Sequence, residues 1–143
     1  MGNNKSAFID IARRLLILQT STGRLRAIDL NNLGAGPVTL RTAGSLPPDN
    51  QSRGHLYPAD GCWYTYVGNG GNSIHKIQPP AGNPLVETWN VSTVQIGGAT
   101  LASQPADAIA SGAVHNTRFF YIKPLGCFAW IAGERNQVAI VKP

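Results

Sequence analysis

The sequence GCWYTYVG at residues 61–68 returns as GCFAWIAG at residues 126–133. Each stretch is a run of apolar and aromatic residues between two glycines, a pattern typical of a buried β-strand bounded by turns. A second apolar segment follows each of them, IHKIQP at residues 74–79 and VAIVKP at residues 138–143. The chain therefore contains a repeated pair of strands, and such repeats indicate an architecture before any local feature does.

A fainter third copy lies upstream, where LLILQT at residues 15–20 is followed by LRAIDL at residues 25–30. In every copy a further strand-like segment precedes the pair, and in the first two copies another one follows it. The preceding segments are residues 8–11, 54–58 and 118–122, and the following ones are residues 38–41 and 86–91, the latter running on to 94–96. Turn-forming residues join the paired strands at residues 21–23, 69–72 and 134–136.

Four consecutive antiparallel strands in about 40 to 50 residues, repeated along a chain, are typical of β-propeller blades. We therefore expect an all-β fold and a single propeller-type domain, with approximate blades at residues 7–44, 53–96 and 113–143. The third unit reaches Pro143 without a fourth strand. Inner blade strands are covered on both faces, which fits the continuous apolar run at residues 15–18, whereas an outer strand should alternate, as residues 86–89 do.

The C-terminal aromatic strands, FFY at residues 119–121, GCFAWIAG at 126–133 and QVAIVKP at 137–143, carry a family resemblance. They resemble the C-terminal blades of bacterial β-propeller proteins, which are broadly similar to the kelch and galactose-oxidase-like propellers. The resemblance implies the architecture only. The copper ligands of galactose oxidase do not map onto this sequence, so oxidase chemistry is not implied.

Composition supports one folded, strand-rich domain. The 143 residues include 43% apolar and 13% charged residues, which is unlike a charge-rich disordered chain. The 16 Gly and 10 Pro are spread between short apolar runs, and this spread argues against a helical bundle.

Charge and hydropathy also limit the kinds of partner. The net charge of +5 indicates a basic surface, but no basic run is longer than Arg13-Arg14, so nucleic-acid binding is not expected. No segment has the length of an apolar membrane span, and residues 1–6 lack the pattern of a signal peptide. We expect a soluble protein with no membrane partner, and the compartment stays unassigned.

A propeller ring closes with about four to eight blades, so three blades leave two end faces open. Exposed apolar faces of that kind drive association. We therefore expect a homo-oligomer, most simply a homodimer that assembles head to tail into a six-bladed ring. The alternative is that the chain is a fragment of a larger closed propeller.

Ligands of propellers usually lie over the central channel, so polar residues just before the first strands of the blades are the candidates. These are Arg53 and His55 in the second unit and His115 and Arg118 in the third. An imidazole can act as a base or ligand, and a guanidinium suits a carboxylate or phosphate. The alternative role is to cap strand ends. Trp89, on an outer strand, is the aromatic residue that we expect to be exposed to a ligand.

Other conspicuous side chains are assigned to structure. Cys62 and Cys127 hold equivalent positions in neighbouring repeats, too far apart for a disulfide, and should be free thiols. His75 should face solvent or lie at an edge. A set of strand aromatics could form a sugar-stacking platform but should instead pack between blades: Trp63, Tyr64, Tyr66, Phe128 and Trp130.

Two functions remain open. The first is a binding module that presents loops around a central channel to a protein, a glycan or a small ligand. The second is part of a propeller enzyme, such as a hydrolase, lyase or oxidase, whose site needs further blades or a partner subunit. The first is favoured because the seven carboxylates and three histidines are scattered, and the sequence contains no motif for a nucleophile, a phosphate loop or a metal site. We expect no cofactor and no catalytic residue in this chain.

Overall fold

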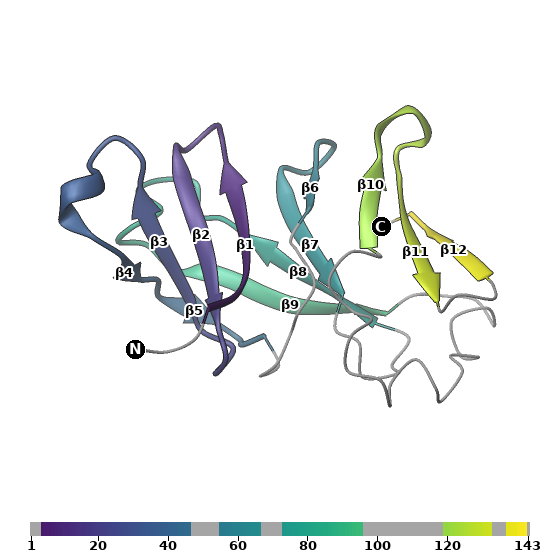
Figure 1. Cartoon of the computed structure of the whole chain (residues 1–143), viewed down its shortest axis with the longest axis horizontal. Coiled ribbons are helices and arrows are strands. Elements are labelled where there is room, and N and C mark those ends of the chain that lie inside the picture. The colour runs from purple at the N-terminus through teal and green to yellow at the C-terminus, as the bar shows by residue number, and fades with distance from the viewer. Residues whose placement is uncertain (1–3, 47–54, 67–72, 96–118, 133–136, 143) are drawn as a thin grey trace.

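The computed structural model is built from β-sheets, which confirms the all-β class (Figure 1). It describes residues 4–46, 55–66, 73–95, 119–132 and 137–142. The described elements in chain order are β1 (Asn4–Asp10), β2 (Leu15–Thr20), β3 (Leu25–Asp29), the 3-10 helix η1 (Leu33–Ala35), β4 (Val38–Thr39), β5 (Thr42–Ala43), β6 (His55–Tyr57), β7 (Cys62–Tyr66), β8 (Ser73–Gln78), β9 (Trp89–Gln95), β10 (Phe119–Ile122), η3 (Lys123–Leu125), β11 (Cys127–Ala132) and β12 (Gln137–Val141).

Three sheets follow one another along the chain. The first has the strand order β1-β2-β3-β4, the second has the order β5-β9-β8-β7-β6, and the third has the order β10-β11-β12. Every pairing between neighbouring strands is antiparallel except that of β5 with β9. The strand pairs that the sequence repeat indicated are β2–β3, β7–β8 and β11–β12.

The connection from the first sheet to the second differs from the prediction. Thr42 and Ala43 fall within the predicted first unit (7–44), but they form β5 and pair in parallel with Trp89 and Asn90 of β9 in the second sheet. The outer strand of the second sheet also begins at Trp89 rather than at Val86. Residues 83–87 form a turn instead, in which the backbone N–H groups of Val86 and Glu87 both donate to the carbonyl of Asn83.

The same hairpin opens each sheet. The register pairs Asp10 with Leu15 in the first sheet, and it pairs the corresponding residues of the other two sheets likewise: Tyr57 with Cys62, and Ile122 with Cys127. The last turn residue has a left-handed backbone in all three, with φ of 53° at Arg14, 68° at Gly61 and 60° at Gly126. These turns all lie along the upper side of Figure 1. The local geometry therefore repeats even where the sequence places Arg instead of Gly.

The first core cluster lies between the first and second sheets. Trp63 of β7 packs against Phe8 of β1, with ring centroids 4.4 Å apart. The other buried members are Leu15, Ile17, Leu25, Ala27, Leu40, Leu46, Ile77, Trp89 and Val91. Burial of each large apolar side chain contributes about 1.5 to 3 kcal/mol, so this cluster is a main source of cohesion between these sheets.

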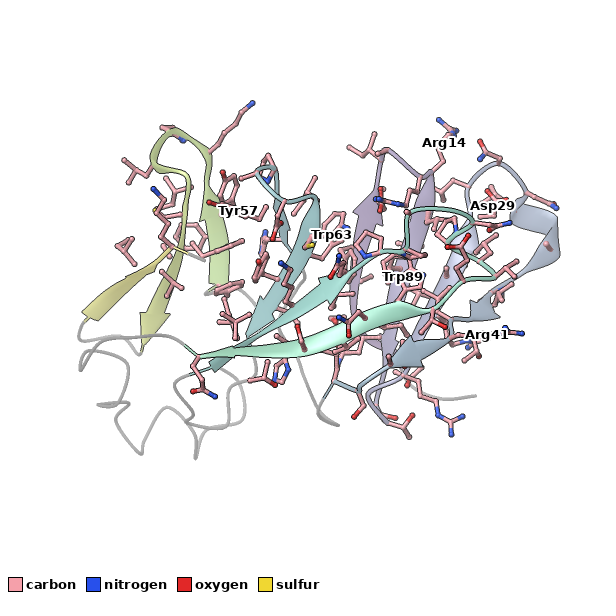
Figure 2. All side chains as sticks on the ribbon, turned by 180° about the vertical axis from the view of Figure 1, so that it is seen from behind. Arg14, Asp29, Arg41, Tyr57, Trp63 and Trp89 are labelled. Carbon is pink, nitrogen blue, oxygen red and sulfur yellow. The ribbon has the colours of Figure 1, made fainter. Side chains whose placement is uncertain are left out.

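The second core cluster lies between the second and third sheets and is richer in aromatic rings. Tyr64 of β7 lies 5.3 Å from Phe128 of β11, and Tyr57 of β6 lies 5.9 Å from the same ring. Figure 2 shows Tyr57 and Trp63 on opposite faces of the second sheet. The expectation that Trp63, Tyr64 and Phe128 pack between sheets is confirmed. The side chains of Tyr66 and Trp130 lie outside the described residues.

Each sheet turns the same face toward its successor. The first and third residues of β2, Leu15 and Ile17, face the second sheet. The first and third residues of β7, Cys62 and Tyr64, face the third sheet. The second residue of β7, Trp63, faces back toward the first sheet. Because side chains alternate along a strand, these contacts define a forward face and a backward face for every sheet.

Candidate functional site

Of the four predicted polar ligand residues, His55 is the one that lies within the described residues. It lies on β6, the edge strand of the second sheet, and its half-buried ring meets Phe119 of β10 edge-on, with centroids 5.8 Å apart. Strands β6 and β10 lie in contact, so His55 is at the junction between the first strands of two sheets. Arg53, His115 and Arg118 lie outside the described residues.

The prediction that Trp89 is exposed is wrong. Its side chain has 0% exposure and belongs to the cluster between the first two sheets. The indole N–H donates to the carbonyl of Pro84 at 2.7 Å, and the backbone N–H donates to the carbonyl of Arg41 at 2.9 Å. Strand β5 runs beside Trp89 and provides cover that an ordinary outer strand lacks (Figure 2). Trp89 therefore has no free face for a ligand.

His75 is also placed differently from the prediction. It lies on β8, between β7 and β9, and its side chain is 8% exposed rather than solvent-facing. Its Nδ1 atom lies 3.5 Å from the hydroxyl of Thr93 on the neighbouring strand. Burial lowers the pKa of His75, because a buried imidazolium loses its hydration. The neutral form is therefore favoured in the folded protein.

A polar cluster that the sequence did not reveal lies on the forward face of the second sheet. The carboxylate of Asp60 accepts a hydrogen bond from the Tyr64 hydroxyl at 2.7 Å and forms an ion pair with Lys76 at 2.8 Å. Its other oxygen accepts the backbone N–H of Cys62 at 2.9 Å. The thiol of Cys62 lies 3.5 Å from the carbonyl of Asp60. One turn residue thus connects side chains of two strands.

Hydrogen bonds within this cluster, together with burial, determine the protonation states of its members. Partial burial opposes ionisation of Asp60, but the hydrogen bonds from Lys76, Cys62 and Tyr64 outweigh it and lower the pKa of the carboxyl. Burial and the hydrogen bond to Asp60 raise the pKa of Tyr64 to about 12. The hydrogen bond to Asp60 also raises the pKa of Lys76. Near neutral pH the cluster holds a carboxylate, an ammonium and a neutral phenol.

These protonation states do not suit acid–base or nucleophilic catalysis. A general base works best with a pKa near the working pH, and a nucleophilic lysine must lose its proton. Burial and the charge of Asp60 raise the pKa of Cys62, so its thiol is not activated either. Both Cys62 and Cys127 are buried and free, as predicted. The cluster is best explained as a structural anchor of the β6–β7 turn.

The register explains why this cluster was missed. Tyr64 and Lys76 are paired directly across β7 and β8, and Asp60 reaches both from the preceding turn. In the sequence, Asp60 is an ordinary turn residue and Lys76 an ordinary surface lysine. Only the pairing of two strands with a defined register brings them together.

Within the described ranges, no group of three or more His, Cys, Asp or Glu residues is arranged to hold a metal ion. None of the helices there is long and apolar enough to cross a membrane. In comparisons with known proteins, no family model, curated protein or solved structure matches the chain. The interpretation therefore depends on the residues and their geometry.

Proposed function

We propose that the chain is a run of three β-propeller blades and that it acts as a binding module, presenting loops around a channel to a protein, a glycan or a small ligand. One observation supports this proposal: at both contacts, each sheet packs its forward face against the backward face of the next sheet. Blades of a propeller pack forward face to backward face around an axis, and the two contacts between sheets follow that rule. The resemblance to bacterial propeller blades has the same implication and is part of the proposal.

The first strands provide the place for a ligand. In a propeller the first strand of each blade lines the channel, and β1, β6 and β10 are all edge strands of their sheets. His55 lies where β6 meets β10, with its ring partly exposed. An imidazole beside an aromatic ring combines a polar group with an apolar surface, a combination that suits sugars and small polar ligands. We place the binding site along these strands.

A binding role is favoured over catalysis by the state of the ionisable groups. The pKa shifts of Asp60, Tyr64 and Lys76 favour one protonation state near neutral pH, and the buried His75 lies on a central strand beside Thr93 of the same sheet. Binding sites depend on shape and on a few polar contacts, whereas acid–base catalysis needs a group near its titration point.

The test is a glycan and peptide array probed with the labelled chain, followed by titration calorimetry on any ligand found. We expect His55→Ala to weaken binding by about tenfold or more, since it removes a polar contact from the site. Val86→Ala is the matched control, because Val86 is exposed in the turn before β9 and away from the first strands. A chain that binds nothing on the arrays would contradict the binding function. A ligand insensitive to His55→Ala would contradict the proposed location.

A further inference from the structure

We propose that two copies of this chain assemble head to tail, with the forward face of the third sheet of one copy packed on the backward face of the first sheet of the other. This inference rests on the proposed blade architecture and adds the partner and the two surfaces. The partner is a second copy, because each end of the run of sheets carries the face that the other end lacks.

The backward face of the first sheet is mostly apolar and partly open, and it carries one basic side chain where Arg26 pairs with Leu18. Ile9 is 53% exposed, and the register pairs it with Leu16, which pairs in turn with Ile28. Leu18 lies two residues further along the same face of β2. Leu16, Leu18 and Ile28 are each only partly buried. The alternate residues of β2, Leu15 and Ile17, are buried against the second sheet.

The forward face of the third sheet is apolar and open at its outer strands, while Ala129 and Cys127 of its central strand are 0% and 3% exposed. Ile140 of β12 is 55% exposed and pairs with Ala129, which pairs with Phe120 of β10. Ile122 pairs with Cys127 at the end of this face. Phe120 and Ile122 are both partly exposed. On the other side of β11, Phe128 is buried against the second sheet.

The two open faces are complementary in kind. Inside the chain, a forward face packs on a backward face at both contacts between sheets. The open face of the third sheet is a forward face, and the open face of the first sheet is a backward one. A second copy can therefore continue the same packing rule at both ends, and two copies then close upon each other.

The composition of the end strands points the same way. A strand covered on one face should alternate apolar and polar residues, whereas β2 begins with Leu-Leu-Ile-Leu and β11 reads Cys-Phe-Ala-Trp-Ile-Ala. Such continuous apolar runs are typical of strands buried on both sides. In a single copy, Leu16 and Leu18 stay partly exposed. The apolar runs of β2 and β11 are therefore typical of strands whose sheet is covered on both faces by other sheets.

The area favours a closed pair over an open one. Five residues along a strand and four strands across give the first sheet a face of about 300 Å², and three strands give the third sheet a face of about 240 Å². One contact between copies covers one face of each kind, roughly 540 Å², which is less than a stable interface usually needs. A closed pair has two contacts and covers about 1,100 Å², which is just above the roughly 1,000 Å² expected of a specific interface. The assembly should therefore be a discrete dimer.

The test is the molar mass of the chain by size-exclusion chromatography with light scattering, over a wide range of concentrations. We expect twice the 15.2 kDa of one chain. Ile9→Asp and Ile140→Asp, one on each face, should each weaken the dimer by at least about 100-fold, because each would bury an unpaired carboxylate. Val86→Asp is the control, since Val86 is 56% exposed and lies on neither face, and it should leave the dimer unchanged.

Mixing the two variants distinguishes head-to-tail from symmetric pairing. Ile9→Asp retains a normal forward face and Ile140→Asp a normal backward face, so the mixture should recover one contact and associate more than either variant alone. Far-UV circular dichroism checks that each variant is folded. A folded native monomer, or a dimer that survives either substitution, overturns the inference. Neither result depends on a ligand, so the array experiment judges the binding function separately.

Discussion

Gly44→Ala should destabilise the protein far more than Gly36→Ala, although both glycines have a left-handed backbone. Their φ values are +79° and +69°. A Cβ atom at Gly36 would meet nothing within 4 Å, whereas one at Gly44 would overlap the carbonyl oxygen of Val91 on β9. The pair therefore separates the cost of the backbone conformation from the cost of close contact between the β5 segment and β9.

The magnitude follows from these two terms. Gly36 has φ of 69° and ψ of −175°, a conformation nearly confined to glycine that costs another residue about 1 to 3 kcal/mol. The lower entropy of the unfolded chain offsets about 0.4 to 1 kcal/mol of this cost, so Gly36→Ala should lose about 1 kcal/mol. At Gly44 the overlap with backbone atoms adds about 1 to 3 kcal/mol, as overpacking does in a core. Gly44→Ala should therefore lose about 2 to 4 kcal/mol, a large part of the usual stability of a domain.

The assay is urea unfolding followed by tryptophan fluorescence, at one protein concentration for all variants because association shifts apparent stability. Trp89 lies beside β5, so its emission should report the loosening of this contact. Equal losses for the two variants would refute the reasoning, since they would mean that the chain at Gly44 does not press on β9.

Three further predictions concern single groups. Burial lowers the pKa of His75 below its unfolded value of about 6.5. The contribution of His75 to the free energy of unfolding should therefore be complete above about pH 6.5 and should decrease as the pH falls below that value, because the unfolded chain binds the proton more readily. The slope should be at most about 1.4 kcal/mol per pH unit. His75→Gln should flatten that part of a stability curve measured against pH, and an unchanged curve would contradict its burial. Tyr64→Phe should cost about 1 kcal/mol in urea unfolding, because it removes the hydrogen bond to Asp60, whose side chain is 30% exposed; no loss would argue against that bond. Gly61→Ala should cost about 1 kcal/mol. Arg14→Gly should cost less, because it relieves the left-handed strain at Arg14 and loses only an exposed hydrogen bond from Arg14 Nε to Asn31. Equal losses would argue against the equivalence of the two turns.

The strands could be predicted because their signals are local. The glycine-bounded aromatic runs of β7 and β11 and the apolar run of β2 each indicate a strand without knowledge of its neighbours. The inward packing of Trp63 and Phe128 followed from the same pattern.

The errors came from contacts between distant segments. Trp89 is buried because β5 crosses to the second sheet and lies beside β9, and no pattern near Trp89 in the sequence records that crossing. His75 is buried because its strand is central rather than an edge. The Asp60–Lys76 ion pair depends on the register of β7 against β8, which one residue of slippage would destroy.

The most direct test of the packing of the sheets in series is a nuclear Overhauser spectrum of the aromatic rings. Phe8 and Trp63 belong to the first and second sheets, with ring centroids 4.4 Å apart, and Tyr64 and Phe128 belong to the second and third, with centroids 5.3 Å apart. Both pairs should give ring-to-ring cross-peaks, from opposite faces of β7. Rings that contact only residues of their own sheet, or a Trp63 and a Tyr64 that share one neighbour, would contradict the arrangement.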